Sequence, residues 1–194
     1  MLIFKRNLNF HLSSKGLQRS FTILIILAVL GMIGIFALNY GLLQRPLNRV
    51  IGRDDRNLGV RATAYFDSYV DLDTIVFDVR GLDPRSGAQG LVRTFLEYAH
   101  ELQGSDIDEV IIAYRGQRKL KIRGDDFLTL GASLGTAQPR EVMWELAHNL
   151  RFLNGKMVMS NLPGNYAALL QKSLGDVQQT EDATANQILQ TIQQ

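Results

Sequence analysis

The best match to a catalytic motif in this sequence is the pentapeptide Gly131-Ala-Ser133-Leu-Gly135, which has the G-x-S-x-G spacing of a nucleophile elbow. In that motif the serine stands on a tight strand-to-helix turn and is activated by a histidine and an acid. His148 does follow, but the acids between them, Glu141 and Glu145, belong to the same expected helix. A hydrolase sheet of the usual size would not fit in this chain. We therefore interpret the pentapeptide as a flexible glycine-rich loop and keep a small serine hydrolase using Ser133 as an alternative.

Other chemistry has less support in the sequence. The 194 residues include no cysteine and only three histidines, which excludes thiolate catalysis and zinc fingers. His100 falls on the outer face of an expected helix, where we expect a solvated charge cluster. A group of acids surrounds the first strong strand without the spacing of a calcium loop: Asp67, Asp71, Asp73, Asp78 and Asp83. We predict no metal, no cofactor and no enzymatic activity.

A basic and aromatic strand face could contact phosphates; it consists of Tyr114, Lys119, Lys121 and Arg123. However, residues 54–194 carry 14 basic and 19 acidic side chains, a net charge of −5. This balance argues against nucleic acid as a partner. A solvated outer sheet face is the simplest interpretation, and lipid headgroups are the best functional one.

Three aromatic residues, Trp144, His148 and Phe152, recur at every fourth position of an expected helix, opposite its apolar stripe. An aromatic ridge that faces away from the core indicates a second contact, and Trp is enriched at binding hot spots. We therefore predict that these residues bind another protein. The alternative is that a C-terminal helix near Tyr166 and Leu170 covers them.

The elements that would position these residues alternate between strand and helix patterns. We expect a strand at 74–80 with Ile75, Phe77 and Val79 on one face, a helix at 86–103, a hairpin at 108–123, a helix at 139–153 and a short strand at 156–159. The inward stripe of the first helix comprises Leu91, Val92, Phe95, Leu96, Ala99 and Leu102. The order β-α-β-β-α-β predicts an α+β domain, a ferredoxin-like two-layer sandwich. The long connection at 124–138 should hold a helical turn near 125–130, although 127–130 is also the strand that an elbow would need.

The hairpin sequence VIIAYRGQRKLKIR, residues 110–123, suits a two-residue turn at Gly116-Gln117. This turn would pair Ala113 with Leu120 and Ile111 with Ile122 on the apolar face. Together with the rest of the layout, the hairpin resembles the POTRA-type modules of bacterial bitopic assembly proteins. Those modules usually have two helices between the first strand and the hairpin, where this sequence has one, and no residue roles follow from the resemblance.

Residues Phe21 to Leu38 form an apolar run of 18 residues without a charge, extended to Leu43. A run of this length suits a membrane-spanning helix, and Ala37-Leu38-Asn39 is a poor cleavage site for a signal peptide. We expect a basic tail at 1–20, a transmembrane helix at 21–43, a polar juxtamembrane linker at 44–58, a soluble domain at 59–175 and a Gln- and Thr-rich tail outside the core at 176–194. Small residues at every third position of the helix could allow a homo-oligomer: Ala28, Gly31, Gly34 and Ala37.

Positive charge is concentrated on both sides of the apolar run. Residues 1–53 carry seven basic side chains and no acidic one, and Arg45, Arg49 and Arg53 are predicted to lie at the membrane surface. Four basic residues precede the run and five lie between Arg45 and Arg61. Export of the charged 20-residue tail is the harder path, so we favour a cytoplasmic N-terminus and a periplasmic or other extracytoplasmic domain.

These features predict a single-pass protein of the bacterial inner membrane. We expect a non-enzymatic adaptor or accessory subunit of an envelope complex, whose partners are membrane lipid and another membrane or envelope protein. The alternatives are the serine hydrolase and a module that binds a lipid or apolar ligand between its helices and sheet.

Overall fold

A computed structural model describes residues 14–83, 87–158 and 186–193 of the chain. Residues 1–37 form one compact unit and residues 38–194 the other. Helix α1 (Ser14–Asn39) contains the apolar run and continues through a π-helical segment, η1 (Tyr40–Gln44), into α2 (Arg45–Arg53). Among the described residues, this is the one helix that is long and apolar enough to cross a membrane.

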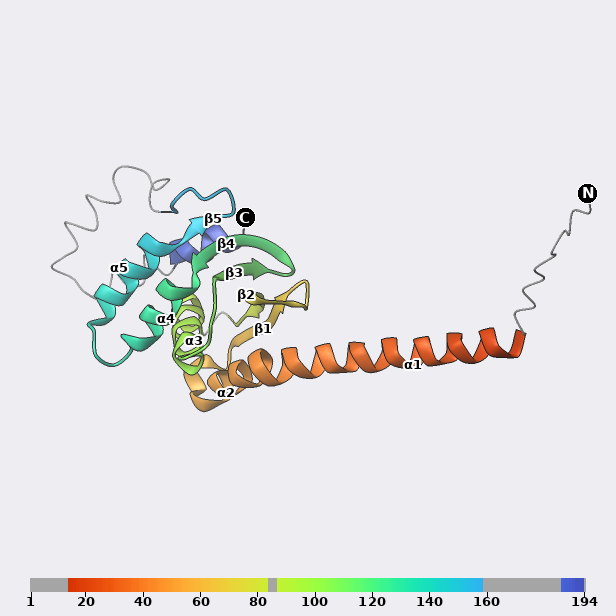
Figure 1. Ribbon diagram of the computed structural model, residues 1–194. Helices are drawn as coiled ribbons and strands as arrows, with labels where there is room; N and C mark the ends of the chain where they lie inside the picture. The colour runs from red at the N-terminus through yellow and green to blue at the C-terminus, as the bar shows by residue number, and fades with distance from the viewer. Residues whose placement is uncertain (1–13, 84–86, 159–185, 194) are drawn as a thin grey trace, which may run out of the picture. The chain divides into compact units, whose positions relative to one another are not determined.

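The second unit contains a five-stranded mixed sheet whose strands are neighbours in chain order (Figure 1). The strands are β1 (Val60–Asp67), β2 (Asp71–Leu82), β3 (Glu109–Tyr114), β4 (Gln117–Arg123) and β5 (Arg151–Phe152). Strands β2 and β3 are parallel, whereas the other neighbouring pairs are antiparallel. A short 3-10 helix, η2 (Asp55–Asn57), connects α2 to β1.

Helices α3 (Gly87–Glu101), α4 (Gly124–Ala132) and α5 (Pro139–Asn149) cover one face of the sheet. All six residues of the stripe predicted for α3 are buried, and the helical turn predicted near 125–130 is part of α4. Aromatic rings fill the centre of the core, with Phe95 lying 5.2 Å from Phe77 and 4.9 Å from Phe127 between ring centroids. The alternation predicted for β2 is also present, because Ile75, Phe77 and Val79 all face this core.

The α+β class is confirmed, but the ferredoxin-like order is not. In a split β-α-β unit another strand separates the two parallel strands, whereas here β2 and β3 are directly hydrogen-bonded. Strand β1, for which the sequence pattern above predicts no element, extends the sheet on the other side of β2. The short strand predicted at 156–159 is reduced to a single bridge between Met157 and Arg151, and the last strand is β5.

The hairpin between β3 and β4 is present, but its predicted register is wrong by one residue. Arg115 and Gly116 have φ angles of 50° and 83°, so they form the two-residue turn with positive φ at both positions that hairpins favour. A bulge between Ile112 and Ala113 follows, and Ile112 pairs with Leu120. As a result Val110, Ile112, Leu120 and Ile122 face the main core, and Ile111 and Ala113 pack with Val76 on the opposite sheet face.

Two segments that were expected outside the core belong to it. The predicted linker at 44–58 contains the amphipathic helix α2, whose Leu47 and Val50 are fully buried. Residues 186–193 form a helix whose Ile188 and Ile192 are also buried, so the prediction that this stripe lies outside the core is wrong. The helix expected around Tyr166 to Leu174 lies outside the described residues.

Candidate functional site

The edge of the sheet formed by β1 is closed by side chains of the helix that leads into the domain. Gln44 Oε1 accepts a hydrogen bond from the backbone amide of Ala64 at 2.9 Å, and Asn39 Oδ1 accepts one from that of Phe66 at 2.7 Å. Asn39 Nδ2 also donates to the carbonyl oxygen of Tyr69 at 3.1 Å. An edge strand presents unpaired backbone groups that can template aggregation, and these two amide side chains satisfy such groups on β1.

The π-helical segment explains how two residues of one helix reach alternate amides of one strand. Asn39 and Gln44 are five residues apart, which is the hydrogen-bond spacing of a π-helix, and the Arg45 amide donates to the Tyr40 carbonyl oxygen across this turn. Ala64 and Phe66 are two residues apart on β1, so their amides point to the same edge. The π turn therefore places both amide side chains along that edge.

Residues 39–57, which connect the apolar run to β1, form the junction of this protein. Through α2 and η2 the junction also contacts the outer side of α3. The Tyr98 hydroxyl donates to the carbonyl oxygen of Leu43 at 3.3 Å, and burial raises the pKa of this tyrosine far above its usual value. Asn57 Nδ2 donates to Glu97 Oε2 at 2.7 Å and lies 3.3 Å from the carbonyl oxygen of Val50. The Arg56 side chain and amide hold the pKa of the Asp54 carboxyl at about 2, below its usual value.

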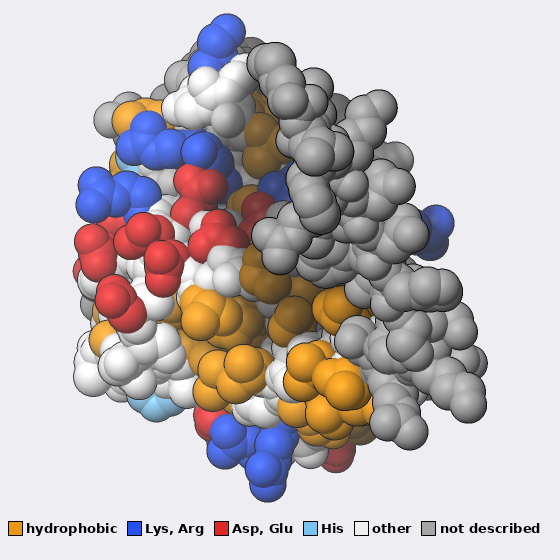
Figure 2. All heavy atoms as spheres, turned by 45° about the vertical axis from the view of Figure 1, so that its right-hand side comes forward, with side chains coloured by type: hydrophobic (Ala, Val, Ile, Leu, Met, Phe, Trp, Pro, Cys, Tyr) orange, Lys and Arg blue, Asp and Glu red, His pale blue; other side chains and the backbone are white. Residues whose placement is uncertain are grey.

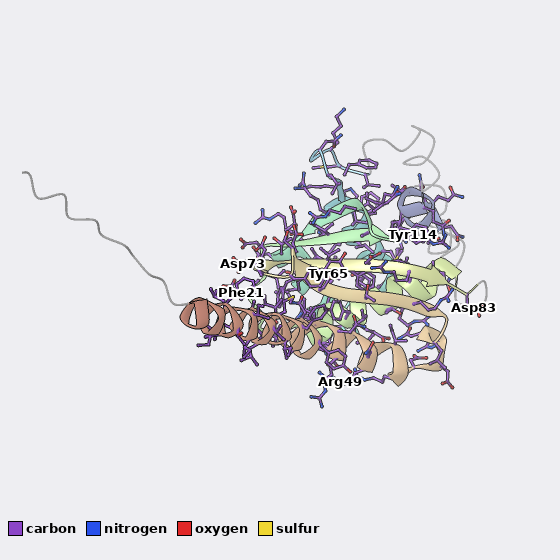
Figure 3. The ribbon with its side chains drawn as sticks, turned by 90° about the vertical axis from the view of Figure 1, so that its right-hand side faces the viewer. Phe21, Arg49, Tyr65, Asp73, Asp83 and Tyr114 are labelled. Atoms are coloured by element: carbon purple, nitrogen blue, oxygen red, sulfur yellow. The ribbon has the colours of Figure 1, made fainter. Side chains whose placement is uncertain are left out.

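The arginines predicted at the membrane surface divide into two groups. Arg49 Nη1 lies 3.5 Å from Glu101 Oε2, and Arg53 forms an ion pair with the other oxygen of the same carboxylate. Arg45 is exposed at the start of α2, and Figure 3 labels Arg49 on the same helix. The outer face of α3 is therefore not the solvated cluster that was predicted: Glu97 and Glu101 contact the junction, and His100 Nδ1 lies 3.1 Å from the carbonyl oxygen of Gly131.

The predicted aromatic ridge consists of two helical residues rather than three. The rings of Trp144 and His148 lie 4.0 Å apart between centroids, and His148 Nδ1 lies 2.9 Å from the carbonyl oxygen of Trp144. Trp144 is 49% exposed. Helix α5 ends at Asn149, so Phe152 lies on β5 instead, where it is half-buried and packs against the core.

Ser133 lies at the C-terminus of α4, where its hydroxyl donates to the carbonyl oxygen of Leu130 at 2.9 Å. Residues 127–130, which would have to form the strand of a nucleophile elbow, are helical. A Cβ atom on Gly131 would lie 2.4 Å from the carbonyl carbon of Ala99, so this glycine lets α4 approach α3. The motif thus has a packing explanation at Gly131 and a helix-terminus explanation at Ser133.

The other predicted residues lie as follows. Gly31 and Gly34 of α1 have no atom within 4 Å of a Cβ built on them, and Ala28 and Ala37 are exposed on the same helix; their role in helix packing stays a prediction. On the basic strand face, Lys121 forms a 2.8 Å ion pair with Glu109.

Two further features of the described structure bear on the sequence predictions, namely the position of Asp78 and the space between the helices and the sheet. Asp78 is fully buried on β2, where it accepts a 3.0 Å hydrogen bond from the Gly116 amide and lies 2.7 Å from Arg80 Nη2. It therefore fixes the β3–β4 turn to the neighbouring strand. An apolar cavity lies between α3, α5, the C-terminal helix and the sheet, but it has room for only about one water molecule. An acyl chain does not fit in a space of this size.

These observations define an α+β domain that is preceded by an apolar N-terminal helix. Comparison of the chain with protein-family models, curated proteins and solved structures found no match.

Proposed function

We propose that this chain is a membrane-anchored, non-enzymatic adaptor or accessory subunit of a bacterial envelope complex. The observation that carries the proposal is that the apolar helix continues into the domain instead of ending in a linker. Its extension supplies Leu43, Leu47 and Val50 to the core, and Asn39 and Gln44 to the sheet edge. A signal peptidase acting after the apolar run would have to cut this continuous helix immediately before Asn39. A retained single-span anchor fits this construction better than a removed leader.

The proposed orientation places the N-terminus in the cytoplasm and the domain on the periplasmic or extracytoplasmic side. It rests on the four basic residues before the apolar run, which resist export against a membrane potential that is negative inside. Because α1, η1 and α2 follow one another without a break, the proposed anchor joins the domain without an extended linker. Such an arrangement suits a protein that presents a binding surface to a membrane partner.

Contact with anionic headgroups is assigned to Arg45 alone among the three arginines. Arg45 lies six residues past Asn39, a rise of about 9 Å along the helix, whereas Arg53 lies about 21 Å past it. The headgroup layer is about 5–8 Å thick on each side of the hydrocarbon core, so the backbone of Arg45 would lie at its outer edge and that of Arg53 well beyond it. Arg49 and Arg53 contact Glu101, and we assign them to the junction.

The surface proposed for the partner protein is the outward side of α5, centred on Trp144 and His148. Half of the Trp144 side chain is exposed although the ring is held against His148. A large, ordered aromatic side chain loses little conformational entropy on binding, which is why Trp is frequent at hot spots. The partner is expected to be another membrane or envelope protein.

The test is affinity purification of the full-length chain from detergent-solubilised membranes, with identification of the proteins that co-purify. Trp144→Ala should lower partner recovery sharply, because a buried interfacial Trp contributes about 2 kcal/mol or more to binding. Leu58→Ala, which alters another exposed apolar residue on a different element, should leave recovery unchanged.

Two results would contradict the proposal. A fall of about 3–5 kcal/mol in the unfolding free energy of Trp144→Ala, followed by circular dichroism, would place this residue in the core. Specific labelling of Ser133 by a fluorophosphonate probe would favour the serine hydrolase, because an unactivated serine does not react with such reagents.

A further inference from the structure

The tip of the hairpin between β1 and β2 has an unusual composition for its backbone. Ser68 and Tyr69 have φ angles of 50° and 65°, and the Val70 amide donates to the carbonyl oxygen of Asp67 at 3.2 Å. Asp67 pairs with Asp71, so the loop has three residues, Ser68, Tyr69 and Val70, and its first two have the positive φ values that Asn and Gly adopt most readily. A tyrosine in this conformation is strained, and strained residues concentrate where function requires them.

The tip also exposes a group of apolar side chains. Tyr69 is 46% exposed, Val70 62% and Leu72 52%. The Tyr69 ring is held in place by stacking on Tyr65, with 5.3 Å between the ring centroids. Single exposed apolar residues are ordinary, but a contiguous group at a projecting turn marks a contact surface.

The junction determines what this tip faces. Asn39 directly follows Leu38, the last residue of the apolar run, and its side chain binds both Phe66 and Tyr69. Because Gln44 binds Ala64 and Asn39 binds Phe66, β1 runs antiparallel to this part of the helix. Asn39 binds both the Phe66 amide and the Tyr69 carbonyl oxygen, so the tip lies at the level of Asn39, where the apolar run has just ended. In the proposed anchor the 18-residue run spans about 27 Å, close to the thickness of the hydrocarbon core, so Asn39 would lie at the edge of that core.

The charges around the tip limit the depth that it can reach. Asp67 pairs with Arg118, whereas the carboxylates of Asp71 and Asp73 are on exposed residues. Figure 2 shows acidic side chains grouped on the face that it presents, and Figure 3 places Asp73 at one end of β2. Exposed carboxylates have to stay hydrated, whereas tyrosine is enriched in the interfacial layer of membranes. The tip is thus suited to shallow immersion, driven by apolar area rather than by attraction to anionic lipid.

We propose that the β1–β2 tip is a second membrane contact, which immerses Tyr69, Val70 and Leu72 in the interfacial layer of the bilayer beside the end of the apolar helix. This inference rests on the proposed membrane anchor. The anchor would fix the position of the chain in the bilayer, and the tip would oppose rotation and tilting of the domain about the helix.

The absence of native cysteine makes the test direct, because one introduced cysteine gives one labelled site. Full-length Val70→Cys and Leu72→Cys variants, each labelled with an environment-sensitive fluorophore, would be reconstituted in phosphatidylcholine vesicles. Controls are Ile33→Cys in the apolar run and Gln117→Cys, an exposed position in the β3–β4 hairpin. Quenching would be measured with aqueous iodide and with lipids that carry a spin label at a shallow or a deep position.

The expected result is that positions 70 and 72 lose most of the iodide quenching seen at 117. Both should be quenched more by the shallow than by the deep spin label, whereas position 33 should be quenched best by the deep one. If position 33 behaves in this way while 70 and 72 are as accessible to iodide as 117, the tip proposal is wrong and the anchor stands. Iodide access at position 33 would overturn both. Protection of 70 and 72 that disappears at low protein-to-lipid ratio would mean that another copy of the chain covers the tip, which also overturns the proposal.

Discussion

At the scale of single residues, Asn39 is the most informative side chain in the described structure. It is 5% exposed, and its amide group binds two backbone groups of the β1–β2 hairpin. A buried amide that uses both its donor and its acceptor is compensated for its loss of hydration, whereas an incomplete network is costly. Asn39 thus fixes the end of the apolar helix to the sheet edge at one register.

Replacing Asn39 by Ala should destabilise the domain by about 2 kcal/mol, because the Phe66 amide and the Tyr69 carbonyl group lose their buried partner. Hydrogen exchange at the Phe66 amide should become faster at the same time. The denaturant midpoint in detergent, followed by Trp144 fluorescence, and exchange mass spectrometry check this prediction. Gln138→Ala, at an exposed position before α5, is the control and should change stability by less than about 0.5 kcal/mol. Equal effects of the two variants would contradict the role of Asn39.

The buried hydroxyl of Tyr98 should make the stability of the folded protein fall at alkaline pH. Burial raises the pKa of its hydroxyl in the folded state, whereas an unfolded tyrosine ionises near pH 10. The stability contributed by the neutral form is therefore complete below about pH 10 and is lost as the pH rises further. Tyr98→Phe should start about 1 kcal/mol less stable, because the bond to Leu43 is missing, yet it should lose less between pH 9 and 11. Parallel stability profiles of the two proteins would contradict this prediction.

At the scale of elements, the sequence identifies those that have a strong periodic pattern. Helix α3, strand β2 and the β3–β4 hairpin are predicted because their apolar residues recur at 3.6 or 2 residues. The hairpin register is not, because the bulge between Ile112 and Ala113 depends on backbone geometry that apolar alternation does not encode. Helix α2 resembles a linker because arginines dominate its composition, although Leu47 and Val50 lie three residues apart on one face.

The candidate site was harder to predict than the fold, for a related reason. In the sequence, Asn39 and Gln44 look like ordinary polar residues at the end of a membrane span. Only the π turn brings their side chains to the same strand edge. The spacing of five residues was the one available signal, and it is uninformative without knowledge of the partner strand. Trp144 was placed correctly on the outward side of α5, but Phe152 was not, because the helix ends three residues before it.

A glycine-to-alanine substitution should destabilise the protein at Gly131, where α3 and α4 pack closely, and should stabilise it at Gly52. In Gly131→Ala the new methyl group would meet the Ala99 backbone, and overpacking of this kind typically costs about 1–3 kcal/mol. In Gly52→Ala the methyl group meets nothing within 4 Å on an exposed turn of α2. That change should stabilise the protein by about 0.5–1 kcal/mol, because glycine is a poor helix former. Denaturant midpoints of both variants check the prediction, and destabilisation by Gly52→Ala would show that α2 is not an ordinary helix.

At the scale of the whole molecule, the helical residues that follow the apolar run are part of the folded domain. The core receives side chains from α2 and also from the C-terminal helix, so segments from both ends of the domain sequence close it. Loss of the helical residues after Leu38 would therefore remove part of the fold together with the proposed membrane anchor. This coupling leads to the expectation that the mature protein keeps its N-terminal segment.

The protein in bacterial membranes should accordingly keep the apolar helix and remain in the membrane after high-salt and carbonate washing. Eighteen apolar residues, most contributing a few tenths of a kcal/mol each on an insertion scale, are enough to hold it there. A phosphatase fused after Gln194 should be active and a fluorescent protein at the same position dark, because the domain is expected outside the cytoplasm. Mass spectrometry that finds a soluble form beginning near Asn39 would identify the run as a signal peptide, whereas a retained protein with the reverse reporter pattern would place the domain in the cytoplasm. The two measurements are independent, since a helix can be retained in either orientation, and only the first bears on the role of the junction.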